Sequence, residues 1–475
     1  MVFSSILFLL IFLPATLALH FLARTFFARN LVLLAASLAF YIWGETVFFP
    51  VLLLSITVHW GFGLLIDRES DPGRRKILLG SGIGIILLLL FYFKYAAFFC
   101  DRLVLPLGHA LGWRAHCLPA PLHLPLGISF FTFQVISYLI DVYRGTITPQ
   151  PRWYKAALYK SFFPQLIAGP IVRYADVAPA FTRRTLALSD FAEGVTRFVV
   201  GLAQKVLIAN VVGRVADRAF SPAYGELTAG IAWLGALCYM FQIYFDFNGY
   251  SNMAIGMGRM FGFRFLENFD HPYAALSITD FWRRWHISLS TWFRDYLYVP
   301  LGGNRISPAR TYVNLYVVFV LCGLWHGANE TFVVWGLYHG TLLVAERMGR
   351  HAGLLPPPGA IRRLYVWLAV IVGWVFFRSA SLPEAGRFLS RMVQVGDAGN
   401  MWGIQDLLTP ELALTLGLAV VFSFPVSAWL RIAANRVPRR GLVDGVEVAG
   451  VGALLALSLI RLAGDAFNPF IYFRF

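Results

Sequence analysis

Charged residues are scarce in this chain of 475 residues. Only 14% of its residues are Asp, Glu, Lys or Arg, and 58% are hydrophobic, whereas soluble domains carry about 25% charged residues. The mean hydropathy of +0.65 agrees with this composition. The shortage of charge excludes a soluble globular protein and indicates a protein of the membrane.

Several functional patterns are missing as well. The sequence contains no Gly-x-Ser-x-Gly motif, with which many hydrolases present a serine nucleophile. Its ten histidines form no His-x-x-x-His pair and none accompanies a Cys-x-x-Cys pair, so no metal site is expected. The net charge of +15 comes from arginines in short loops between apolar runs. This is the positive-inside pattern of membrane proteins, and no nucleic-acid partner is expected.

Only four cysteines are present. Cys238 and Cys322 lie within apolar runs and are expected to be small core residues. Cys100 and Cys117 bracket one loop, which the charge pattern places outside the cytoplasm. Compartments outside the cytoplasm are oxidising, so the two thiols could form a disulfide there or stay free; their spacing alone does not decide.

Long apolar runs take the place of charge. The first, residues 3–19, follows no basic residue and lacks a cleavage site, so we expect a retained transmembrane helix. Placing the arginine-rich loops in the cytoplasm leaves loops 100–124 and 379–408 and both termini outside. At about 20 residues per span, the chain would cross the membrane about eleven or twelve times. We therefore expect an all-α polytopic membrane protein that forms a single domain over residues 1–475.

Two segments are too polar or too irregular to be simple spans. Residues 153–174 carry Lys160 and Pro164 among apolar residues, which predicts a broken or re-entrant helix, buried in protein or lining a cavity. Residues 280–298 place aromatic side chains on one helical face and arginines on the other. This pattern predicts one amphipathic helix lying at the cytoplasmic interface.

Two histidines lie in strongly apolar surroundings. His326 belongs to a stretch, 311–345, with a single charged residue, and His286 falls on the aromatic face of the predicted interfacial helix. Burying an imidazole is costly without a partner, and its unperturbed pKa suits general-base catalysis near neutral pH. Each histidine alone is compatible with a hydrogen bond between packed helices. Two of them, each beside a tryptophan (Trp285 and Trp325), indicate a common site.

The loop after the predicted interfacial helix is a candidate anion site. Its sequence, PLGGNR over 300–305, combines exposed amides with Asn304 and Arg305, which could meet a phosphate-bearing acyl carrier. Three further charged residues near the same face are candidates either for donor contacts or for buried ion pairs that hold broken helices together: Arg173, Asp246 and Arg294.

Several long motifs together resemble the membrane-bound O-acyltransferases, in particular the bacterial branch typified by alginate O-acetyltransferase. They include FWRRWHISLS, PLGGNR and WHGA, and the similarity extends over nearly the whole chain. Asn248 and Asn252 depart from the branch pattern, where serine and aspartate are more usual. The motifs occupy residues 1–5, 125–133, 163–174, 244–251, 281–305, 325–328 and 376–378.

The resemblance implies acyl transfer within a funnel that crosses the membrane. His326 matches the family's essential histidine and would act as general base for the attacking hydroxyl. His286 matches the second histidine and would orient the donor thioester or polarise its carbonyl. A dry site would favour the acceptor over water. No bound cofactor is expected, and acetyl-CoA is the expected acyl donor, with Trp285 and Trp325 among its contacts.

The last six residues, 470–475, contain one arginine among aromatic and apolar side chains. One interpretation is a helix end anchored in the interfacial aromatic belt of the membrane. The other comes from a resemblance to a C-terminal motif of bacterial polymer-acylating systems. By that analogy Tyr472 would carry the acyl group before a second enzyme takes it.

The expected function is O-acetylation of an extracytoplasmic polysaccharide such as alginate, by an enzyme surrounded by the lipid of the bacterial inner membrane. The chain has no extracytoplasmic module to grip a polymer, so a periplasmic or extracellular partner is expected. In related systems that partner is a serine esterase-like acetyltransferase. The alternatives are acylation of peptidoglycan or cellulose, or D-alanylation of teichoic acid. A secondary transporter is disfavoured because the sequence shows no repeat.

Overall fold

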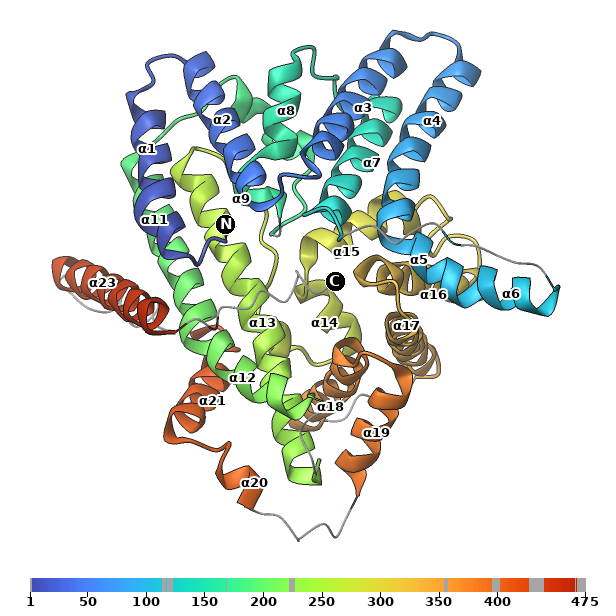
Figure 1. The fold of residues 1–475 in the computed structure, drawn as a ribbon, viewed down its shortest axis with the longest axis vertical. Helices are drawn as coiled ribbons and strands as arrows, with labels where there is room; N and C mark the ends of the chain where they lie inside the picture. Colours follow the sequence, from blue (N-terminus) through green and yellow to red (C-terminus); the bar gives the residue numbers. More distant parts are fainter. Residues whose placement is uncertain are drawn as a thin grey trace. The chain divides into compact units, whose positions relative to one another are not determined.

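The computed structural model describes residues 2–112, 117, 123–167, 169–221, 227–353, 358–394, 402–426, 440–465 and 467. Every regular element among these residues is a helix, as Figure 1 shows. The prediction of an all-α protein is confirmed.

Many helices begin where the sequence combines a capping side chain with a proline. Asp71 accepts a hydrogen bond at 2.7 Å from the amide three residues on, at the start of α4 (Pro72–Leu90). Ser307 makes the same contact at 3.2 Å before α16 (Pro308–His326). The cap satisfies an amide that has no helical partner, and a proline in the first turn loses no helical hydrogen bond. Local sequence therefore sets where these helices start.

The described chain divides into two compact units. The first contains residues 7–194 and 257–266. Within it α3 and α4 both pack against α7, and α2 packs against α8. The helices of this unit are α1 (Leu13–Leu22), α2 (Phe26–Gly44), α3 (Phe49–Arg68), α4, α5 (Ala96–Phe99), α6 (Leu105–Ala110), α7 (Ile128–Arg144), α8 (Trp153–Ser161), α9 (Phe163–Leu166) and α10 (Tyr174–Val177).

The second unit contains residues 195–256 and those from 267 onward. Within it α17 packs against both α16 and α18. That residues 1–475 form one domain stays a prediction. Helix α11 (Leu188–Ala203) starts in the first unit and ends in the second. Helix α13 (Ala229–Met260) starts in the second unit and ends in the first. The others are α12 (Asn210–Ala219), α14 (Ile278–Arg284), α15 (Ile287–Phe293), α16, α17 (Glu330–His351), α18 (Gly359–Arg378), α19 (Leu382–Val393), α20 (Trp402–Gln405), α21 (Pro410–Phe422) and α23 (Arg440–Gly464).

Seven helical stretches in the described part of the chain are long and apolar enough to cross a membrane. Two shorter apolar stretches, Phe8–Leu22 and Pro410–Phe422, accompany them. The protein is therefore a multi-pass membrane protein, while the count of eleven or twelve crossings stays a prediction. The seven are Phe26–Gly44, Phe49–Arg68, Pro72–Ala110, Leu188–Ala219, Ala229–Met260, Gly359–Arg378 and Val443–Gly464.

Residues 153–174, predicted to form a broken helix, do contain a break. Helix α8 ends at Ser161, Phe162 adopts an extended ψ of 110°, and the short α9 follows. Lys160 is fully buried, and its Nζ donates to Ser55 Oγ and, at 3.3 Å, to the carbonyl of Phe131. The break in the helix is confirmed. That the segment re-enters the membrane stays a prediction.

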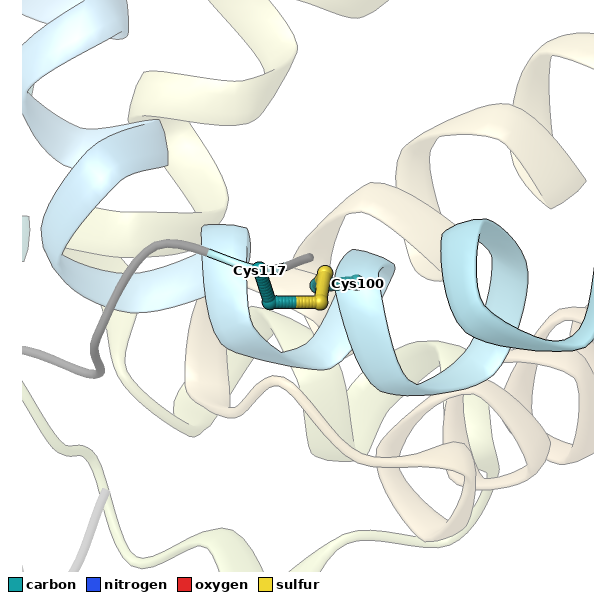
Figure 2. Close-up of a disulfide and its surroundings, with 2 residues drawn as sticks. All are labelled: Cys100 and Cys117. Carbon is teal, nitrogen blue, oxygen red and sulfur yellow. A yellow bond between two sulfur atoms is a disulfide. The ribbon is translucent and has the colours of Figure 1, made fainter. Parts of the chain in front are cut away.

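Two of the four cysteines form a disulfide and the other two are free. Cys100 and Cys117 form a disulfide, with Cα atoms 6.0 Å apart, and Figure 2 shows the bond beside the helical segment that carries Cys100. The question that spacing left open is answered in favour of the bond. Cys238 and Cys322 are free and buried, as expected for core residues.

Helices α16 and α17 touch through their backbones. A Cβ atom at Gly323 would lie 2.1 Å from the carbonyl oxygen of Phe332, and one at Gly336 would lie 2.3 Å from that of Phe319. Real Cβ atoms do not come so close to a backbone oxygen. The two glycines therefore allow the close packing that small residues give to membrane helices.

Replacing Gly323 with alanine should force these two helices apart. We expect a loss of about 1–3 kcal/mol of stability, as overpacking of a core usually costs. Thermal unfolding of the purified protein, followed by tryptophan fluorescence, measures the effect. Gly80→Ala on α4 is the control, because a Cβ there meets no atom within 4 Å. Equal melting temperatures for the two variants would contradict the close contact.

Candidate active site

His326 is the last residue of α16. Gly327 then adopts an extended conformation, and Asn329 caps the next helix by accepting from the Thr331 amide at 3.1 Å. The turn between α16 and α17 therefore places the histidine at a helix end, where its ring is only 5% exposed.

Three aromatic rings surround His326. Ring centroids of Trp325, Trp335 and Phe377 lie 4.9, 5.4 and 5.0 Å from the imidazole. Trp335 comes from α17 and Phe377 from α18, so three consecutive helices build this wall. The rings and the low exposure of the residue keep bulk water from the histidine.

His286 lies in a break between two short helices, so the prediction of one continuous helix over 280–298 is wrong. Helix α14 ends at Arg284, His286 has a φ of 43°, and α15 starts at Ile287. The break is held by a neighbouring segment of chain. The Ile287 amide donates to the Asn268 carbonyl at 2.9 Å, and the carbonyl of Arg284 accepts from the Asp270 amide at 3.0 Å.

The side chain of His286 is nevertheless buried, at 1% exposure. Its Nδ1 lies 3.1 Å from Asn268 Oδ1 and 3.4 Å from Ser288 Oγ. Its Nε2 has no hydrogen-bond partner within the described part of the chain. The residue lies outside the candidate spans, and burial lowers its pKa to about 3, so the imidazole is neutral at neutral pH.

One indole connects the two histidines. The ring centroid of Trp325 is 6.3 Å from that of His286 and 4.9 Å from that of His326. The three residues are buried in the second unit. The structure thus brings together His286, Trp325 and His326, which are 40 residues apart at their extremes in the sequence.

Trp285 belongs to the framework behind this site. It is 3% exposed and packs against Trp374 at 4.9 Å and Phe269 at 5.0 Å, measured between ring centroids.

Three residues around the histidines were not predicted from the sequence: Trp335, Asn268 and Ser288. An aromatic position such as Trp335 is indistinguishable from ordinary core in a sequence this apolar, and nothing in the pattern singles out the two polar residues.

Asp246 forms a buried ion pair. Its Oδ1 lies 2.5 Å from Lys205 Nζ, and the two side chains are 4% and 1% exposed. Asp246 comes from α13 and Lys205 from the helical segment 204–209 that continues α11. Of the two interpretations open for Asp246, the ion pair is the one that the geometry supports.

The 300–305 loop is tight, as its glycines predicted. Gly302 and Gly303 have φ angles of 98° and 55°, which favour glycine. Asn314 Nδ2 donates to the carbonyls of Leu301 at 3.3 Å and Gly303 at 2.9 Å, so α16 holds the loop in place. Two candidate donor contacts on the loop are exposed: Asn304 and Arg305.

Two of the remaining candidates are among the described residues, Arg294 and Arg173. Arg294 is 60% exposed and pairs with the adjacent Asp295, with Nε and Oδ1 2.6 Å apart. Arg173 belongs to the first unit, where its backbone amide donates to Asp176 Oδ2 at 3.2 Å at the start of α10. Tyr472 lies outside the described residues.

Comparison with known proteins agrees with the motifs. The family model for "MBOAT, membrane-bound O-acyltransferase family" matches residues 148–381. The probable alginate O-acetylases AlgI of Pseudomonas putida and Azotobacter vinelandii are 42% and 40% identical, over the whole of both chains. A peptidoglycan O-acetyltransferase of Helicobacter pylori is 37% identical over all of this chain and 98% of its own length.

The family model covers the part of the chain that contains His286 and His326, and relatives align with this chain from end to end. The chain belongs to the membrane-bound O-acyltransferase family and is an O-acyltransferase enzyme.

Proposed function

We propose that the protein is an O-acetyltransferase of the bacterial inner membrane that acetylates an extracytoplasmic polysaccharide. Acetyl-CoA in the cytoplasm would supply the acetyl group, alginate is the first candidate acceptor, and a periplasmic acetyltransferase would complete the transfer. The observation that carries this proposal is the pair of buried histidines whose rings both lie near the Trp325 indole. The names of two end-to-end relatives, each a probable alginate O-acetylase, support the acceptor class.

The chemistry needs one base and one dry pocket. A hydroxyl oxygen attacks the thioester carbonyl carbon, a C–O bond forms, and the C–S bond breaks. His326 takes the hydroxyl proton and returns it to the departing sulfur, so the products are an ester and the CoA thiol. The aromatic wall around His326 would keep water from competing for the acetyl group.

The donor's phosphates need positive charge at the cytoplasmic face. Arg305 and Asn304 lie on the exposed loop, and Arg294 lies on the surface just before it. Arginine binds phosphate through several donors at once. We assign these residues to the CoA moiety, and they should affect the KM for acetyl-CoA more than kcat.

Tyr472 is proposed as the acyl relay. Its phenol would attack acetyl-CoA, and the O-acetyl group would then pass to the periplasmic partner. Radiolabelled acetyl-CoA mixed with the purified protein in nanodiscs tests both steps. We expect label on the wild type and none on Tyr472→Phe or His326→Ala.

Comparing the wild type with Tyr472→Phe and His326→Ala distinguishes the relay from the enzyme activity itself. Label that persists in Tyr472→Phe but is lost in His326→Ala would retain the enzyme and remove the relay. Absence of both label and CoA release, even with the partner present, would contradict the proposed donor.

Peptidoglycan is the second candidate acceptor. A relative of full length carries the name peptidoglycan O-acetyltransferase. The protein and its partner can be supplied with alginate or peptidoglycan fragments. Ester formation, measured by mass spectrometry, then shows which of the two polymers is the acceptor.

A further inference from the structure

Asn268 contacts the His286 side chain most closely. Its Oδ1 lies 3.1 Å from His286 Nδ1, 2.8 Å from Ser288 Oγ and 3.4 Å from the Ser288 amide nitrogen. Its Nδ2 donates to Ser251 Oγ at 3.0 Å. All four side chains are at most 2% exposed, so the network is shielded from water.

This network fixes the orientation of the Asn268 amide. The backbone N–H of Ser288 can only donate, so the group that faces it must be the carbonyl oxygen. The opposite orientation would direct the Asn268 NH₂ group at that N–H and would remove the donor to Ser251. The oxygen therefore points toward His286.

The same oxygen fixes the tautomer of His286. A carbonyl oxygen only accepts, so His286 Nδ1 must carry the proton in this contact. A neutral imidazole has one N–H, which leaves a lone pair on Nε2. That atom is buried and has no hydrogen-bond partner in the described ranges, which is costly unless a ligand supplies one.

We propose that Asn268 is a positioning residue that holds His286 as its Nδ1-protonated, neutral form, so that Nε2 accepts a hydrogen bond from an N–H or O–H group of the substrate. This proposal rests on the proposed function and refines one part of it. An acceptor atom cannot polarise the thioester carbonyl, because that carbonyl also accepts. His286 instead orients the substrate.

Two substrate groups have the required chemistry. The pantetheine arm of acetyl-CoA offers amide N–H groups, and the attacking alcohol offers an O–H group. If the amide is the donor, loss of the acceptor raises the KM for acetyl-CoA. If the hydroxyl is the donor, kcat falls instead. Steady-state kinetics of the Asn268 variants therefore tells the two sources apart.

The tautomer itself can be measured without any reaction. Protein labelled with ¹⁵N-histidine and held in nanodiscs gives distinct solid-state NMR signals for protonated and unprotonated ring nitrogens, and His286→Gln assigns the signals of this residue. We expect Nδ1 protonated and Nε2 unprotonated in the wild type. A protonated Nε2 in the wild type would overturn the proposal.

Variants of Asn268 test whether this residue holds the tautomer of His286. Asn268→Leu should release the tautomer, so that a protonated Nε2 signal appears, and lower kcat/KM by on the order of 10–100-fold, the usual effect of losing a group that orients a functional histidine. Asn268→Asp keeps an acceptor oxygen and should keep Nδ1 protonated. Unchanged signals and unchanged kinetics in Asn268→Leu would overturn the proposal.

The matched control is Asn30→Leu. Asn30 is a buried asparagine of the first unit that donates to the Phe181 carbonyl at 2.9 Å and accepts from Arg184 at 2.7 Å, and it has no role in the proposed site. This variant should leave the His286 signals as they are. If the wild type fails to use acetyl-CoA, the proposed function fails, while the NMR spectra still decide the tautomer of His286.

Discussion

Replacing His326 with glutamine or alanine should lower the rate of acetyl transfer by about 10²–10⁴-fold, the contribution of a general base. The histidine is buried against Trp335 and Phe377, and its neighbour Trp325 also contacts His286. Glutamine keeps volume and polarity but cannot take a proton near neutral pH. The measurement is release of CoA thiol from acetyl-CoA with acceptor and partner present.

Two comparisons separate chemistry from packing. Wild-type melting temperature in His326→Gln would show that the loss of activity is chemical. His351→Ala, at the exposed end of α17, should be as active as the wild type. Near wild-type turnover in His326→Gln would make this residue a packing histidine and would remove the proposed mechanism.

The second large effect concerns the ion pair between Lys205 and Asp246. Removing one partner of a buried pair leaves an uncompensated charge and usually costs about 3–5 kcal/mol. The pair is almost inaccessible, and its two charged atoms are 2.5 Å apart. We therefore expect Lys205→Met to melt at a clearly lower temperature than the wild type.

The double variant Lys205→Met/Asp246→Leu decides what Asp246 does. Because it removes both charges, it should recover much of the lost stability. A stable and active double variant would show that Asp246 is structural, whereas a stable variant with a raised KM for acetyl-CoA would return it to the donor site. Arg264→Ala is the control, since its pair with Asp190 is exposed and such pairs contribute about 0–1 kcal/mol.

Properties that depend on local sequence could be predicted. The shortage of charge and the length of the apolar runs indicated an all-α membrane protein, and proline and polar residues marked the break after α8. Capping residues such as Ser307 set helix starts. The apolar surroundings of His286 and His326 were enough to single out these two residues. In the fold both lie near the indole ring of Trp325.

Properties that depend on distant contacts could not be predicted. The periodicity over 280–298 fits a continuous helix, but backbone hydrogen bonds from the 268–270 segment end α14 at Arg284 and turn the chain at His286. Likewise no cation lies near Asp246 in the sequence, and only the packing of α13 on the 204–209 segment brings Lys205 to it. Asn268 has no sequence signal because an asparagine before a phenylalanine is compatible with any loop.

The charge pattern predicts that the loop closed by the Cys100–Cys117 bond lies outside the cytoplasm, so this bond would report the orientation of the chain in the membrane. Thiols pair and stay paired in oxidising compartments, whereas reducing cytoplasm keeps them apart. A chain inserted in the opposite sense would carry two reduced cysteines at these positions and lack a covalent closure that correctly inserted chains possess. On that prediction, the thiol content at these two positions differs between the two orientations, and a thiol-reactive mass tag would measure it in intact cells.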